Sequence, residues 1–205
     1  YERWWHMSLN QVENVTWRGK VKYFALSSGT SGAPSKHIPI TEDMTRAMRR
    51  AGRKMFFALS NFDIDPELYT KDMMMLGGSS DLVDQGGYFV GDLSGINASK
   101  PPFWLRPYYK PGTEISRISD WNARIGEIVK KAPAWDVGFL VGIPSWLQLM
   151  MERIIDHYQL ETIHDIWPNL RVCVHGGIHF EPFRKSFEKL MAFPLVYMDS
   201  YLASE

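Results

Sequence analysis

The hydrophobic positions in the first part of the chain predict two short extended segments followed by a helix. Residues 22–26 (KYFAL) form an apolar run typical of a strand, and residues 36–40 (KHIPI) are expected to be extended because Pro34 and Pro39 disfavour helix. A helix is predicted from Thr41, whose hydroxyl can cap the first turn. Its apolar face has helical spacing and consists of Met44, Met48, Ala51, Met55 and Leu59.

The second half of the chain predicts alternating helices and strands. Residues 144–160 (PSWLQLMMERIIDHYQL) are predicted to be helical, with Pro144 in the first turn. The expected core stripe of this helix is Trp146, Leu149, Met150, Ile154 and Tyr158. Residues 171–177 then predict a strand that ends in a glycine turn, and residues 181–191 predict an amphipathic helix.

A second strand is predicted to begin at residue 194, which completes a strand–helix–strand unit. Short connections make the two strands of such a unit parallel. The segments that follow the strands, HGGIH and DSYLASE, should therefore lie at the same edge of a sheet. In open α/β sheets, ligands bind at this carboxyl edge.

Composition and charge exclude several classes of protein. Lys and Arg together number 23, as do Asp and Glu, so no overall field favours nucleic acid or an anionic membrane as a partner. The single cysteine, Cys173, excludes an internal disulfide and is typical of a cytoplasmic protein. No apolar run approaches the roughly 18 residues that a membrane span needs. Because the sequence begins at Tyr1 and ends at Glu205, we expect a piece of a longer protein.

The segment SSGTSGAPSK, residues 27–36, is the strongest candidate for a binding loop. It is not a Walker loop, because His37 follows the lysine and the nearby prolines disfavour the required helix. We expect its backbone N–H groups to form a nest for phosphates. The side chains that could assist are Ser28, Thr30, Ser31 and Lys36. A surface linker is the alternative.

Other candidate groups carry weaker signals. The segment GGSSDL, from Gly77, has no following lysine and is expected to be a structural turn. His175 and His179 lack the additional ligands of a zinc site and are expected to be partly buried, satisfied side chains. Cys173 lies in an apolar strand, where it is expected to be a small core residue. A hydroxyl and a carboxylate such as Ser204 and Glu205, opposite a phosphate loop, are what a magnesium–nucleotide site needs.

Three motifs resemble those of the adenylate-forming superfamily of acyl- and aryl-CoA synthetases, luciferases and nonribosomal adenylation domains. SSGTSGAPSK resembles its phosphate loop, HGGIHFEP its adenine-side glycine turn, and YLASE its aromatic-x-x-Ser/Thr-Glu motif. Within the superfamily, the chain is similar to the auxin-responsive Gretchen Hagen acyl-acid–amido synthetases and their bacterial relatives. The segments that carry this closer resemblance are FALSSGTSGAPSKHIPIT, LGGSSDL, GDLSGI and IWPNLRVCVHGGIHFEPF.

This resemblance implies an α/β fold with layered helices, a mixed sheet and a β-rich element in the middle. The chain would be part of the large N-terminal domain of an adenylate-forming enzyme, without its C-terminal lid domain. We divide it into a phosphate loop plus helix (24–60), a loop and β-rich insertion (61–110), and an α/β segment with the strand–helix–strand unit (111–205).

The resemblance also implies a ligase that uses ATP and Mg²⁺ to convert a carboxylic acid to its acyl-adenylate, with release of pyrophosphate. An amine, typically of an amino acid, then captures the acyl group and AMP leaves. The expected partners are a small-molecule acid, an amine and the remainder of the same chain. Two alternatives stay open: an acyl- or aryl-CoA ligase of the phenylacetate type, and a non-catalytic module that binds nucleotide or acyl groups.

Each site residue takes its expected role from its place in the family's motifs. The phosphate-binding residues would be Ser27, Ser28, Gly29, Thr30, Ser31, Gly32 and Lys36. Gly176 and Gly177 would lie near adenine, and Tyr201 against its face. Ser204 would contact the α-phosphate and Glu205 would hold Mg²⁺, so that Lys36, Ser204 and Glu205 form the expected catalytic set. Leu202 and Ala203 depart from the plant motif. Candidates for the acyl pocket are Val141, Trp146 and Met150, which are equally consistent with a helical core stripe.

Because the family's ribose-binding aspartate and its lid with a catalytic lysine lie beyond Glu205, the chain as given should form little or no acyl-adenylate. The measurement is acid-dependent AMP formation by this chain and by the full-length protein. Turnover by the chain alone at the full-length rate would contradict the expectation.

Overall fold

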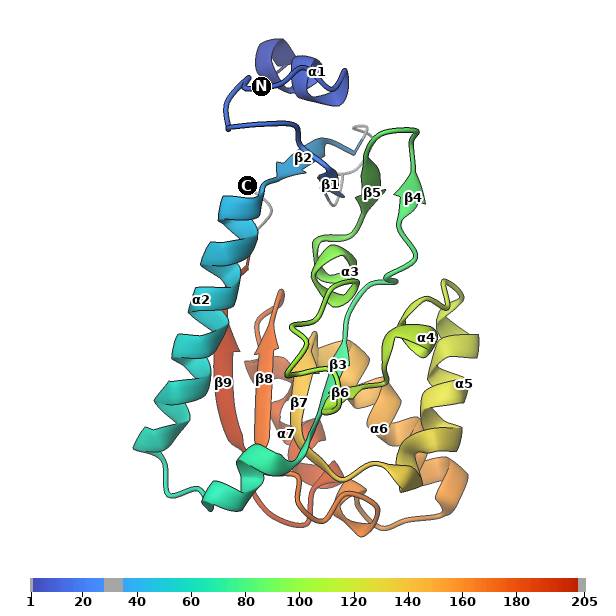
Figure 1. Ribbon diagram of the computed structural model, residues 1–205. Helices are drawn as coiled ribbons and strands as arrows, with labels where there is room; N and C mark the ends of the chain where they lie inside the picture. The colour runs from blue at the N-terminus through green and yellow to red at the C-terminus, as the bar shows by residue number, and fades with distance from the viewer. Residues whose placement is uncertain (1, 28–34, 203–205) are drawn as a thin grey trace. The chain divides into compact units, whose positions relative to one another are not determined.

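The protein is described by a computed structural model that covers residues 2–27 and 35–202 (Figure 1). The chain divides into two compact units, which are described separately. The first unit consists of Tyr1–Ile64, Gly78–Lys100 and Ala203–Glu205. The second unit consists of Asp65–Gly77 and Pro101–Leu202.

A mixed four-stranded sheet forms the centre of the first unit, with the order β2-β1-β5-β4. Strand β1 pairs with β2 in antiparallel and with β5 in parallel orientation. The bounds of the four strands are Tyr23–Leu26 for β1, His37–Ile40 for β2, Val83–Asp84 for β4 and Phe89–Gly91 for β5. The two extended segments predicted around residues 22–26 and 36–40 are therefore confirmed.

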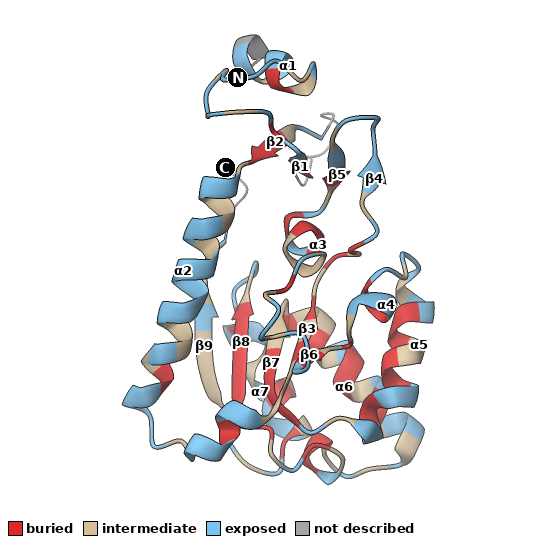
Figure 2. Cartoon of the chain, viewed as in Figure 1, coloured by how far each residue is buried: buried red, intermediate tan, exposed pale blue. Residues whose placement is uncertain are grey.

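Helix α2 (Glu42–Ala58) follows β2 at the predicted position. Thr41 caps it, because the backbone N–H of Met44 donates to the Thr41 hydroxyl at 3.1 Å. Met44 and Met48 pack against buried residues of the sheet, whereas Ala51 is exposed. The helix is exposed along most of its length, and its basic residues lie on this exposed surface (Figure 2).

The first unit also contains α1 (Glu2–Leu9), the one-turn helix η1 (Leu59–Asn61) and α3 (Leu93–Ala98). The segment GGSSDL packs tightly against the start of α3. The Gly78 N–H donates to the Ser94 hydroxyl at 2.9 Å, and a Cβ on Gly95 would lie 2.1 Å from the Ser79 carbonyl oxygen. These contacts agree with the structural turn predicted for this segment.

The second unit is built on a five-stranded, wholly parallel sheet with the order β6-β3-β7-β8-β9. Its strands are β3 (Asp72–Leu76), β6 (Tyr109–Lys110), β7 (Val137–Gly142), β8 (Val172–Gly176) and β9 (Val196–Ser200). The strands of residues 61–110 are divided between the two sheets, since β3 and β6 lie here while β4 and β5 lie in the first sheet. The predicted parallel pair near the C-terminus is present as β8 and β9.

Helices α6 and α7 lie on the same face of this sheet (Figure 1). The helices of the second unit are η2 (Pro66–Thr70), α4 (Thr113–Ser116), α5 (Trp121–Lys131), η3 (Ala132–Ala134), α6 (Pro144–Tyr158), η4 (Ile163–Asp165) and α7 (Glu181–Leu190). Helices α6 and α7 agree with the sequence prediction. In the described part of the chain, no helix combines the length and the apolar character that crossing a membrane requires.

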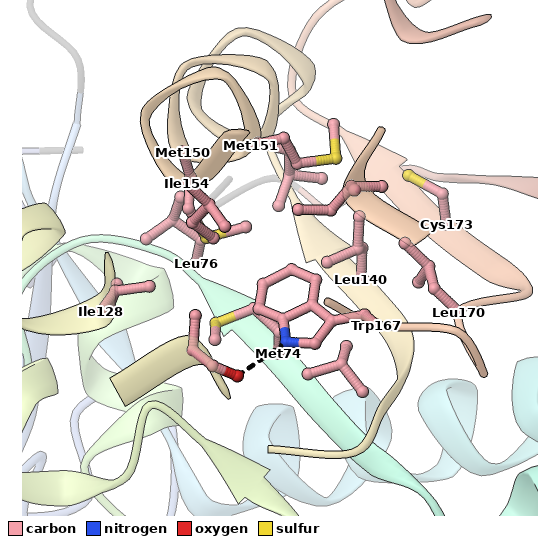
Figure 3. Close-up of a cluster of buried hydrophobic side chains, with 14 of the residues drawn as sticks. Met74, Leu76, Ile128, Leu140, Met150, Met151, Ile154, Trp167, Leu170 and Cys173 are labelled. Atoms are coloured by element: carbon pink, nitrogen blue, oxygen red, sulfur yellow. Dashed lines mark hydrogen bonds between the residues drawn. The ribbon is translucent and has the colours of Figure 1, made fainter. Parts of the chain in front are cut away.

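The hydrophobic core of the second unit lies between the sheet and its helices (Figure 3). Trp167 is fully buried there, and its indole N–H donates to the Ala132 carbonyl at 3.0 Å. Met74 and Leu140 contribute from neighbouring strands, and Cys173 from β8. A buried indole removes a large apolar surface from water while its one polar group stays paired, so it stabilises the fold without an unsatisfied donor.

The buried face of α6 differs from the predicted stripe. Met150 and Ile154 are fully buried as expected, but Leu149 is 37% exposed, and Leu147 and Met151 are fully buried instead. The buried positions still follow helical spacing, but on a face turned toward residues 147 and 151. Apolar residues at four of the five positions 147–151 (LQLMM) made the sequence compatible with either face.

Leu147→Ala should therefore destabilise the protein by about 2–5 kcal/mol, because it leaves a cavity in the core. Leu149→Ala removes the same atoms from the same helix at an exposed position and should cost less than about 1 kcal/mol. Equilibrium urea unfolding of both variants measures the difference. Equal losses would contradict the observed orientation of α6.

Candidate functional site

The candidate segment in the first unit is the connection between β1 and β2. Immediately after β1, the Ser27 N–H donates to the Lys36 carbonyl at 3.0 Å, and the Lys36 N–H donates to the Ser27 hydroxyl at 2.9 Å. The two residues therefore close the base of the loop predicted to bind phosphates. Lys36 is exposed. The other predicted phosphate-binding residues lie outside the described residues: Ser28, Gly29, Thr30, Ser31 and Gly32.

The chain enters a strand, not a helix, directly after Lys36. A Walker loop places its lysine at the start of a helix, whose N-terminal N–H groups face the phosphates. The prediction that this segment is not a Walker loop is therefore confirmed. Any phosphate contacts from the loop have to come from its own backbone and side chains.

The candidate site in the second unit is the carboxyl edge of its parallel sheet. Strand β8 ends at Gly176 and β9 ends at Ser200, and these two residues are paired in the register. The motifs HGGIH and DSYLASE therefore leave the sheet side by side, as predicted. Gly177 has φ of +83°, a conformation that a residue with a Cβ rarely adopts.

Gly176 has a packing role that the sequence reasoning missed. A Cβ on this residue would lie 2.2 Å from the Ser200 carbonyl oxygen and 2.7 Å from its hydroxyl oxygen. The resemblance to the family's motif implied only that Gly176 lies near adenine. The structure shows a second requirement, which is close approach between the ends of β8 and β9. Only the strand register reveals that Ser200 is the neighbour.

Tyr201 follows β9 and is 95% exposed, so its ring is accessible at the carboxyl edge of the sheet. Leu202 is also exposed. Ser204 and Glu205, the expected α-phosphate and Mg²⁺ residues, lie outside the described residues. The accessible part of this edge thus includes the Gly177 turn and the Tyr201 ring.

His175 lies directly beneath this turn and is buried, with 5% of its surface exposed. Its ring stacks on Phe180 with the centroids 4.3 Å apart. Nδ1 is buried without a hydrogen-bond partner among the described residues, and lies 3.6 Å from the Asp199 carboxylate. Burial lowers the pKa of His175, a shift that Asp199 opposes and Arg184 reinforces. The residue was expected to be satisfied, and for Nδ1 this expectation is wrong.

The remaining candidate groups, His179 and Cys173, differ in their exposure. His179 is exposed, so the expectation that it is partly buried is wrong. Within residues 2–27 and 35–202, no three His, Cys, Asp or Glu side chains are grouped to hold a metal ion. Cys173 is fully buried, and burial raises the pKa of its thiol to about 12. A thiol so far from ionisation is inert at neutral pH, so the prediction of a small core residue is confirmed.

The three residues predicted for an acyl pocket lie in different surroundings. Val141, near the carboxyl end of β7, is half-buried. Trp146 packs against Trp121 with the ring centroids 5.0 Å apart, and Met150 is fully buried in the core. Two hollows on the second unit, of about 560 Å³ between α5 and α6 and about 300 Å³ beside α4, are lined by other residues.

The profile of the GH3 family N-terminal domain matches residues 7–126, which is more than half of the chain. This chain belongs to the GH3 family. The match includes the loop closed by Ser27 and Lys36, and it ends before β8 and β9.

Solved structures support the assignment of the GH3 fold. The chain is similar to a structure titled "GH3.15 acyl acid amido synthetase", with a TM-score of 0.69 and 13% sequence identity, over 98% of this chain and 45% of that one. It is also similar to "AtGH3.15 acyl acid amido synthetase in complex with 2,4-DB", with a TM-score of 0.59 and 16% identity, over 91% and 42% of the two chains. At these identities the likeness shows the fold alone.

This GH3 chain therefore spans less than half the length of those structures, as expected for part of a large N-terminal domain. Its α/β architecture agrees with the predicted fold class. No curated protein matches its sequence significantly.

Gly176→Ala should destabilise the protein by about 1–3 kcal/mol, because the new methyl group would overlap the Ser200 backbone. Gly126→Ala is the matched control. Gly126 lies inside α5 with no heavy atom within 4 Å of an added Cβ, so alanine should stabilise that helix by about 0.5–1 kcal/mol. Opposite signs in urea unfolding are expected, and a neutral Gly176→Ala would show that β8 and β9 are not so closely paired.

Proposed function

We propose that the full-length protein is an acyl-acid–amido synthetase, which activates a carboxylic acid with ATP and transfers the acyl group to an amine. Membership of the GH3 family is the observation that carries the proposal. Two structural features support it: a loop closed by Ser27 and Lys36, and an exposed aromatic ring, Tyr201, beside a glycine turn at the carboxyl edge of a parallel sheet.

The described residues fit an adenine ring at this edge. Tyr201 offers an exposed aromatic face on which a flat base can stack. Gly176 and Gly177 carry no side chain that would cover such a base. We assign Tyr201 to the face of adenine and the two glycines to its edge, as the family's motifs imply.

Lys36 and the residues of its loop are assigned to the β- and γ-phosphates of ATP. Ser204 is assigned to the α-phosphate and Glu205 to Mg²⁺, both from the motif alone. Bound Mg²⁺ would neutralise charge on the phosphates. The positive charge of Lys36 would act in the same way, and so would any loop N–H groups that face the phosphates, since preorganised donors stabilise charge that develops during reaction.

The proposed reaction has two steps. An oxygen of the acid attacks the α-phosphorus, the bond to the bridging oxygen breaks, and pyrophosphate leaves with that electron pair. The amine nitrogen then attacks the acyl carbon, AMP leaves as an anion, and the amine loses a proton. The alternative enzyme, a coenzyme A ligase, shares the first step. It differs only in the second step, where the thiol of coenzyme A replaces the amine as the nucleophile.

The acid pocket is proposed at the end of β7. Val141 is half-buried there and remains the best placed of the three candidate residues. Full burial of Met150 favours its role in the core, and contact with Trp121 favours a packing role for Trp146. A lid domain and a ribose-binding group are assigned to the remainder of the protein.

The first test is acid-dependent exchange of labelled pyrophosphate into ATP by the full-length protein, with a library of carboxylic acids. Lys36→Ala and Glu205→Ala should each lower exchange by about 100-fold or more, because each removes charge stabilisation at the phosphates. Lys54→Ala is the matched control, since Lys54 is an exposed lysine on α2, and it should exchange at the wild-type rate. Full exchange by both site variants would overturn the roles assigned to Lys36 and Glu205, and no exchange by the wild-type protein would favour a non-catalytic binding module.

Product analysis separates the two enzymatic alternatives. Mass spectrometry after incubation with an active acid, ATP and either an amino-acid panel or coenzyme A should find an amide. A thioester without an amide would overturn the synthetase and favour the coenzyme A ligase.

A further inference from the structure

The carboxyl ends of β8 and β9 are joined by contacts that the proposed nucleotide roles do not include. The Ser200 hydroxyl donates to the His175 carbonyl oxygen at 2.9 Å. On the same strand, Asp199 brings its carboxylate to 3.6 Å from His175 Nδ1. His175 therefore contacts the last two residues of β9 through its backbone and its ring.

The surroundings of His175 restrict where its ring can go. The ring is stacked on Phe180 with an interplanar angle of 15°, and Phe180 itself lies 4.7 Å from Tyr197. Arg184 of α7 lies over Phe180, and its guanidinium is paired with Glu181. The stack fixes the plane of the ring, and the Asp199 carboxylate faces Nδ1 at 3.6 Å, just beyond hydrogen-bond distance.

The other buried histidine of the second unit provides a contrast. His164 Nε2 lies 3.1 Å from the Leu170 carbonyl oxygen, and Nδ1 accepts the Ala192 N–H at 3.0 Å. Both nitrogens are thus paired with backbone near the amino ends of β8 and β9. His175, near the carboxyl ends of the same strands, instead leaves Nδ1 unpaired among the described residues. An unpaired buried polar atom destabilises a fold, so its presence here needs an explanation other than stability.

We propose that His175 is a positioning residue for nucleotide binding. It acts through Asp199 and Ser200, which immediately precede Tyr201, and sets the direction in which the chain leaves β9. The side chain of Tyr201 is almost fully exposed and makes few contacts of its own, so the two residues before it hold its backbone in place. This inference rests on the proposed function, because it assumes that Tyr201 contacts the base of ATP.

The test measures both the dissociation constant of ATP by calorimetry and the kinetics of pyrophosphate exchange, on the full-length protein. His175→Leu keeps an apolar side chain on Phe180 and removes Nδ1. It should weaken ATP binding and raise the KM for ATP about tenfold while kcat changes less than threefold, because a contact made equally in the ground and transition states is lost. His175→Asn retains a polar N–H near the position of Nδ1 and should restore KM to within about threefold of wild type.

His164→Leu is the matched control for loss of a buried histidine. It should lower the thermal midpoint, because the Ala192 N–H and the Leu170 carbonyl lose their partner, but leave the affinity for ATP unchanged. Asp199→Ala should weaken ATP binding as His175→Leu does. The double variant of His175→Leu and Asp199→Ala should bind ATP no more weakly than the weaker-binding single variant. The losses should not add, because both substitutions remove the same contact.

Wild-type affinity for ATP in His175→Leu would overturn the inference, as would an equal loss of affinity in His164→Leu. Additive losses in the double variant would overturn the contact with Asp199. If the wild-type protein binds ATP but shows no exchange, the synthetase proposal is contradicted. The ATP dissociation constants of the variants would then still decide the role of His175. A wild-type protein that binds no ATP would overturn both.

Discussion

Parallel pairing of β8 with β9 requires the chain to cross over between them, and α7 makes this crossover. The pairing brings Gly176 opposite Ser200, where the backbones lie so close that a Cβ has no room. The arrangement of the carboxyl edge at β8 and β9 depends on this contact. The glycine turn, the ring of His175 and the start of the Tyr201 segment all take their positions from the register of these two strands.

The core beneath the sheet maintains that register. Trp167 fills the space beside Met74 and Leu140 with its indole N–H paired, and α6 adds Leu147 and Met150 to the same cluster. A close-packed interior cannot shift by fractions of a side chain without strain. The edge can therefore carry an exposed ring and a buried nitrogen that has no hydrogen-bond partner among the described residues, because the stability of the unit comes from elsewhere.

The loop at residues 27–36 is organised differently. Its two ends are joined by reciprocal hydrogen bonds between Ser27 and Lys36, at the point where β1 and β2 separate. A hairpin-like closure of this kind leads from one strand directly into the next and needs no helix after Lys36. This arrangement explains why a lysine can follow a Ser/Gly-rich segment here without the Walker spacing.

Local patterns predicted a large part of this fold. The strand at 22–26, the cap at Thr41 and the strand–helix–strand unit near the C-terminus depend on turn residues and on apolar spacing over a few positions, so they could be read directly. The buried face of α6 could not. Apolar residues crowd positions 147–151, and only the packing of α6 against β7 and its neighbouring helices selects Leu147 over Leu149.

For the candidate site, the amino-acid sequence by itself determined which kinds of residue follow each strand. Small and hydroxylated residues before Lys36, glycines after β8 and an aromatic ring after β9 are properties of composition and order. Tertiary structure alone decided which of them meet. The pairing of Gly176 with Ser200, and the burial of His175 beside Asp199, depend on strand register between residues about 24 positions apart. Local patterns contain no information on such a register, because it is set by packing across the whole sheet.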